Sequence, residues 1–158
     1  MPSSSHEPLR LASRLLATRV GLTVLGAPDL ELAAAVARAP NQPMIAVMLG
    51  HALIATEDPA RFAEAEGVLK NAVNRDNDNP FAWYQLGIVY DRKGDRARAN
   101  LATAERRNLA GETKLALAAA RSAMMELKVG TPDYLRAQDI AMVSETQLKK
   151  KNKRDDGK

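Results

Sequence analysis

The 158-residue chain has no cysteine, only two histidines, and aromatic residues at 4% of its length. Without cysteine it forms no disulfide and offers no thiolate nucleophile or cysteine metal site. A zinc site would need histidines and carboxylates that converge, but His6 and His51 lie far apart in the sequence. No segment approaches the ~18 uninterrupted apolar residues of a membrane span. These absences predict a protein that is not an enzyme, with no metal, no cofactor and no membrane-spanning helix.

The net charge of +4 comes from one end of the chain. Residues 149–158 contain six Lys and Arg against two Asp, so the remainder of the chain is neutral overall. We expect 149–158 to be a basic, disordered tail. Such a tail is able to contact anionic lipid or nucleic acid, and this is the lesser functional alternative. Because the rest of the chain is neutral, no nucleic-acid partner is expected.

The composition favours helices, because Ala and Leu are abundant and no run alternates as strands do. We expect the polar residues 1–8 to be disordered. Residues 9–43 are expected to form N-terminal helices that pack on the repeats. For the Arg-rich segment 9–25 a cleaved targeting signal is the alternative. Further helices are predicted at 44–56, 60–75, 81–92, 96–110, 112–128 and 132–148.

The stretch Asn79–Ala99 encodes a helix, a tight turn and a second helix. Pro80 suits the first turn of a helix, Gly94 the left-handed position after its end, and Asp95 the N-cap of the next. The spacing of large and small residues matches the tetratricopeptide-repeat (TPR) pattern W-x2-L-G-x2-Y…A at Trp83, Leu86, Gly87, Tyr90 and Ala99. The later Phe of that pattern is replaced by Thr103. A generic helical hairpin is the alternative interpretation.

The spacing of small residues predicts a repeat. Ala65 and Ala99 are separated by one TPR period, and Gly94 and Gly111 by half of that period. The sequence therefore predicts an all-α fold. Its expected form is a TPR-like right-handed superhelix of antiparallel helical hairpins, with about six to eight helices and a repeat domain over residues 44–148.

The segment Leu127–Ile140, LKVGTPDYLRAQDI, resembles the closing segment of bacterial BepA-like zinc metalloproteases. The stretches His51–Pro59 and Asn79–Asp95 also look like the C-terminal TPR domain of that family. The zinc-binding His-Glu-x-x-His motif of the peptidase domain is missing. The resemblance implies a non-catalytic domain in the periplasm or cell envelope that recruits substrates or an outer-membrane assembly protein.

In TPR arrays the first helix of each hairpin lines a groove that takes extended or helical peptide segments. The predicted groove residues are Phe81, Tyr84, Gln85, Ile88, Asp91 and Arg92, with His51 and Ile54 on the matching face one TPR period earlier. Tyr84 and Ile88 would supply apolar anchors. Gln85 would hold peptide backbone and Arg92 would add a cation. The alternative is that Tyr84 and Ile88 pack on the neighbouring hairpin.

The leading hypothesis is therefore a non-catalytic TPR module for protein–protein interaction. Its expected partners are protein or peptide segments, with a peptidase domain or an outer-membrane assembly protein as candidates from the family resemblance. A free-standing TPR scaffold, located in the cell envelope or the cytoplasm, is the alternative.

Overall fold

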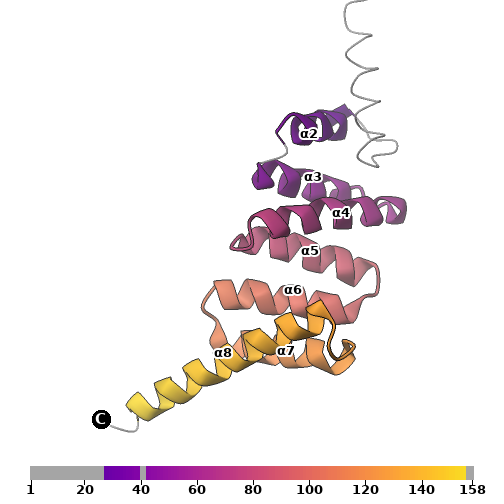
Figure 1. Ribbon diagram of the computed structural model, residues 1–158. Helices are drawn as coiled ribbons and strands as arrows, with labels where there is room; N and C mark the ends of the chain where they lie inside the picture. The colour runs from indigo at the N-terminus through magenta and orange to yellow at the C-terminus, as the bar shows by residue number, and fades with distance from the viewer. Residues whose placement is uncertain (1–26, 40–41, 156–158) are drawn as a thin grey trace, which may run out of the picture. The chain divides into compact units, whose positions relative to one another are not determined.

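The computed structural model of the protein describes residues 27–39 and 42–155 (Figure 1). These residues form seven α-helices and no strand, which confirms the all-α class. The superhelical arrangement stays a prediction. The chain divides between Arg75 and Asp76 into two compact units. The predictions for residues 1–8 and 9–25 lie outside the described residues.

The first unit contains three described helices, α2 (Ala27–Arg38), α3 (Pro43–Ala55) and α4 (Pro59–Arg75). Helix α3 packs against both of the others. It begins at a proline, which costs no hydrogen bond in a first turn. Because α3 is apolar around most of its circumference, it buries side chains on two sides, namely Val47, Leu49, Leu53 and Ile54.

Gly50 sits where α3 lies against α4. A Cβ atom placed on Gly50 would stand 2.5 Å from Cγ and 2.6 Å from Cδ2 of Leu69, whose side chain is fully buried. Carbon atoms do not approach that closely without displacement. The missing side chain of Gly50 is therefore what lets Leu69 fill the space between the two helices.

The second unit contains α5 (Pro80–Arg92), α6 (Arg96–Leu109), α7 (Thr113–Glu126) and α8 (Pro132–Asp155). Each helix packs on the next, and α8 also contacts α6. Alanines dominate the core shared by α6, α7 and α8, which lets their backbones approach closely. Its buried members are Leu101, Ala104, Ala116, Ala120, Ala123, Ala137, Ile140 and Ala141.

The turns between these helices follow the predicted chemistry. Gly94 has a φ of 76°, and the Asp95 N–H donates to the Tyr90 carbonyl at 2.8 Å, which closes a Schellman motif. Asp95 then caps α6 by accepting the Arg98 N–H at 3.0 Å. The predicted left-handed position of Gly94 and the predicted cap at Asp95 are thus confirmed, and Gly111, with a φ of 70°, ends α6 with the same geometry.

Residues 149–155, the described part of the basic segment 149–158, differ from their prediction. They were expected to be disordered, but α8 continues without interruption to Asp155. Lys and Arg are good helix formers, and no Pro or Gly interrupts the run before Gly157. Cations in the last turn are also favoured by the helix dipole, and Lys153 and Arg154 occupy that turn. Residues 156–158 lie outside the described residues.

The burial patterns of α3 and α5 show that the predicted offset between equivalent positions of these two helices, one TPR period, is too short. The buried residues Val47, Leu49, Leu53 and Ile54 correspond, at an offset of 36 positions, to buried residues of α5, namely Trp83, Gln85, Val89 and Tyr90. The polar run 76–79 lengthens the connection before α5, so an offset of one TPR period selects the wrong face of α3. At the observed offset the position equivalent to Tyr84 is Met48, which is exposed.

Candidate binding site between α5 and α6

A cleft of about 460 Å³ opens between α5 and α6, inside the second unit. Small residues bring the two helices together here, and a Cβ on Gly87 would meet Ala102 Cβ at an ordinary 3.5 Å. Larger side chains border the opening. The lining residues are Trp83, Tyr84, Gly87, Ile88, Asp91 and Arg92 from α5, with Ala99, Asn100, Ala102, Thr103 and Arg106 from α6.

Thr103 lines the α6 side of this cleft, at the position where the TPR pattern has Phe. A phenylalanine side chain is far larger than that of threonine. The departure from the pattern thus leaves space beside Gly87 and Ala99 that an aromatic ring would take up.

Two aromatic rings stand beside the cleft on α5. The rings of Phe81 and Tyr84 are stacked with centroids 6.4 Å apart, and the residues are 42% and 47% exposed. From α6, the Arg106 guanidinium carbon lies 5.6 Å from the Tyr84 ring centroid, within cation–π range. This contact fixes a positive charge beside an exposed apolar surface.

Trp83, which lines the cleft, also belongs to a cluster centred on Arg136 of α8. Its guanidinium stacks 4.7 Å from the ring centroid of the buried Trp83 and hydrogen-bonds to the side chains of Glu105 and Asn77. Trp83 Nε1 donates to the Asn77 carbonyl at 2.8 Å. One side chain of α8 therefore holds α5, α6 and the segment before α5 in a fixed arrangement. We call these four residues the Arg136 cluster.

A second ion pair joins α6 to the start of α8. Arg98 Nε lies 2.7 Å from Asp133 Oδ2, and Arg98 Nη1 lies 2.9 Å from Asp95 Oδ2. The hydrogen bond with Asp133 raises the pKa of Arg98 above its ordinary value. Arg98 is therefore a fixed cation in a structural contact between helices.

The predicted groove residues separate into three groups. The cleft itself includes Tyr84, Ile88, Asp91 and Arg92, and Phe81 contacts it through the Tyr84 ring. Gln85 differs from expectation, because it is 2% exposed and its Oε1 has no hydrogen-bond partner. It follows Tyr84 by one position, about 100° around the helix, and so faces the core.

The remaining two predicted residues, His51 and Ile54, belong to α3 in the first unit. His51 is exposed and Ile54 is buried, as the longer offset between α3 and α5 explains. The sequence prediction missed the α6 side of the cleft, above all Arg106. The substitution of Phe by Thr103 was the available signal for that side, since it marks a missing large side chain next to Gly87.

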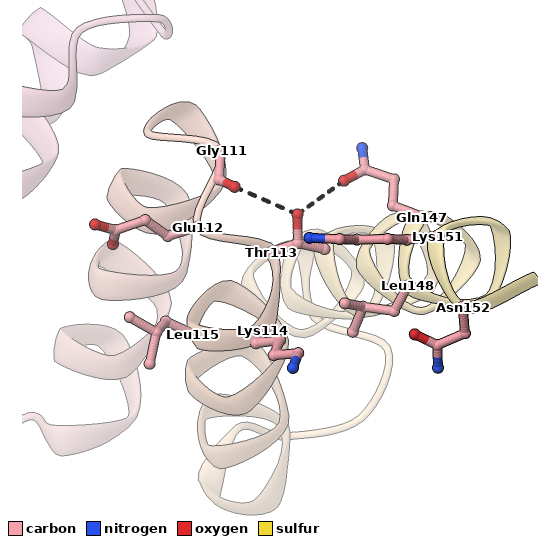
Figure 2. Close-up of a pocket in the computed structure, with 9 residues that line it drawn as sticks. All are labelled: Gly111, Glu112, Thr113, Lys114, Leu115, Gln147, Leu148, Lys151 and Asn152. Carbon is pink, nitrogen blue, oxygen red and sulfur yellow. Dashed lines mark hydrogen bonds between the residues drawn. The ribbon is translucent and has the colours of Figure 1, made fainter. Parts of the chain in front are cut away.

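A second hollow of about 760 Å³ lies between the start of α7 and the last turns of α8 (Figure 2). The Thr113 hydroxyl lies 3.1 Å from Gln147 Oε1 and 3.4 Å from the Gly111 carbonyl. Lys114 and Lys151 border it, and Glu112 is paired with Arg107.

Within residues 27–39 and 42–155, no three His, Asp or Glu side chains converge in a way that would hold a metal ion. The described helices also include none with both the length and the apolar character needed to cross a bilayer. No family model, curated protein or solved structure matches this chain. The similarity to BepA-like proteins therefore remains a resemblance in sequence.

Proposed function

We propose that this protein is a non-catalytic, TPR-like interaction module that binds a protein segment in the cleft between α5 and α6. The observation that carries the proposal is the exposed Phe81–Tyr84 pair beside a cleft of about 460 Å³. That volume falls within the ~300–1,000 Å³ of typical ligand sites. Exposed aromatic side chains next to an unfilled cleft are typical of the anchors of binding surfaces.

The charges around the cleft favour an acidic segment. Arg92 and Arg106 border it and Asp91 is the acidic member, so the rim carries a net positive charge. Arg106 is already held over Tyr84, which lowers the cost of ordering it on binding. The proposed ligand is a segment with an aliphatic side chain that enters the cleft beside Ile88 and with Asp or Glu next to it. Because one hairpin makes a short site, we expect a Kd on the order of 1–100 µM.

The binding test uses labelled peptides that carry one leucine flanked either by Glu or by Lys, measured by fluorescence polarisation against the full chain. We expect the Glu-flanked peptide to bind more tightly. Tyr84→Ala should raise its Kd by about tenfold or more, the usual effect of losing an aromatic anchor. Thr103→Phe should also weaken binding, because the added ring takes the space of the leucine.

Matched controls are Tyr134→Ala and Arg121→Ala, which remove the same residue types away from the cleft lining. These variants should bind as the unmodified chain does, whereas Arg106→Ala should lose the preference for Glu-flanked peptides. The proposal is wrong if the cleft variants and the controls have the same Kd for every peptide.

The wider role is part of the same proposal. The resemblance of Leu127–Ile140 to BepA-like metalloproteases supports a recruiting domain in the periplasm or cell envelope, joined to or working with a zinc peptidase. The reading frame upstream of Met1 tests this, because a His-Glu-x-x-His motif encoded there favours it over a free-standing scaffold. Incubation of this chain alone with casein and zinc should yield no cleavage, and zinc-dependent turnover would contradict a non-catalytic role.

A further inference from the structure

Helix α8 has one buried side and one long exposed side. The buried residues Ala137, Ile140, Ala141 and Ser144 are at most 6% exposed and face α6 and α7. On the opposite side the helix exposes three apolar residues followed by four cations. We call this the outward face of α8, formed by Leu135, Met142, Val143, Lys149, Lys150, Lys153 and Arg154.

These seven side chains point in similar directions. At about 100° per residue they fall within an arc of about 140° around the helix. Leu135, Met142 and Val143 are 49%, 59% and 49% exposed, so apolar surface lies open to solvent along two turns. Asp139 is the acidic side chain within the arc. The face is therefore apolar toward its start and strongly cationic at its end.

The cations of this face differ from four arginines of the second unit that hold its helices and turns together. Arg98, Arg107, Arg121 and Arg136 each pair with a carboxylate and join two helices or the two ends of a turn. By contrast, none of the ion pairs among the described residues includes Lys149, Lys150, Lys153 or Arg154. Their charge is not used to hold the fold together, so it remains available to an external anion.

We propose that the outward face of α8 binds the surface of an anionic lipid membrane. A helix that combines exposed apolar side chains with Lys and Arg on one face lies in the boundary between headgroups and acyl chains. The long Lys and Arg stems place their charges among lipid phosphates while Met142 and Val143 contact the acyl region. This surface shares no residue with the cleft between α5 and α6. It therefore stands independently of the peptide-binding proposal.

Membrane fits these residues better than nucleic acid does. Binding to the phosphates of a nucleic acid would not bury the three exposed aliphatic side chains. The outward face of α8 also carries no aromatic residue on which a nucleic-acid base would stack. The ordered helix is also what brings the apolar and cationic residues to one side, which a disordered tail would not do.

The test is sedimentation of the full chain with vesicles of phosphatidylglycerol or of phosphatidylcholine. We expect binding to phosphatidylglycerol that weakens with salt, and little binding to phosphatidylcholine. The combined replacement of Lys149, Lys150, Lys153 and Arg154 by Gln should lower the partition coefficient on the order of 10³-fold, since each cation near an anionic surface contributes about 1 kcal/mol. Met142→Ser should lower it roughly threefold to tenfold, because the apolar contact is lost.

The matched control removes four exposed cations elsewhere, with Gln at Lys70, Arg96, Lys114 and Lys128, and should retain most of the binding. Circular dichroism checks that each variant keeps its helix content. If both four-residue variants lose the same amount of vesicle binding, the proposal is overturned, because the net charge of the protein alone would then explain the binding. It is also overturned if duplex DNA binds as tightly as the vesicles and Met142→Ser changes neither affinity.

Discussion

Substitution of Gly50 tests the close packing of α3 on α4. Ala at this position places a methyl group 2.5 Å from Leu69 Cγ, and Leu69 has no exposed surface into which to move. Overpacking of this kind costs about 1–3 kcal/mol, whereas Gly→Ala within a helix gains about 0.5–1 kcal/mol. The two effects oppose each other, and the steric cost is larger. We therefore expect Gly50→Ala to lower the free energy of unfolding by about 1–2 kcal/mol.

Two other helical glycines provide matched controls for this prediction. At Gly67 a new Cβ meets nothing within 4 Å, and at Gly87 it would lie at the ordinary distance of 3.5 Å from Ala102. Gly67→Ala should therefore raise the free energy of unfolding by about 0.5–1 kcal/mol, and Gly87→Ala should be neutral or mildly stabilising.

Urea denaturation followed by far-ultraviolet circular dichroism measures all three variants. The order of stability should be Gly67→Ala first, Gly87→Ala next and Gly50→Ala last. A Gly50→Ala variant at least as stable as Gly67→Ala would refute the reasoning, because Leu69 would then have to tolerate the new methyl group without loss of packing.

Two further substitutions test the second unit. Arg136→Ala should lower the free energy of unfolding by about 1–3 kcal/mol and change the fluorescence of Trp83, because it leaves the buried Glu105 carboxylate without its cation. The exposed pair Arg121–Glu145 is the control, and Arg121→Ala should cost less than about 1 kcal/mol. Ser144→Ala should stabilise the protein by about 1 kcal/mol, since the Ser144 hydroxyl is buried without a hydrogen-bond partner. Urea denaturation checks both results, and a destabilised Ser144→Ala variant would contradict the second.

The sequence predicted the helices well because their signals are local. Proline at the start of α5, Gly94 with a positive φ and the Asp95 cap each act within one turn of the chain. Such signals do not depend on how distant helices pack. The end of α8 was the exception, where net charge was taken to indicate disorder although lysine and arginine favour helix.

The candidate site was predicted on one of its two sides. Helical periodicity placed Tyr84, Ile88 and Arg92 on a common face, and all three line the cleft. Periodicity did not reveal that Gln85 is buried. A residue about 100° around the helix from an exposed face is buried or exposed according to which helix packs beside it. The opposite side, with Arg106, depends on how α6 lies against α5, which no single-helix pattern specifies.

By itself, therefore, the sequence determined the all-α class, the positions of most helix ends and the α5 side of the cleft. Only the tertiary structure decided the offset between α3 and α5, the Arg136 cluster and the outward face of α8. The physical reason is separation along the chain. Arg136 and Asn77 are 59 residues apart, and their contact depends on the packing of every helix between them.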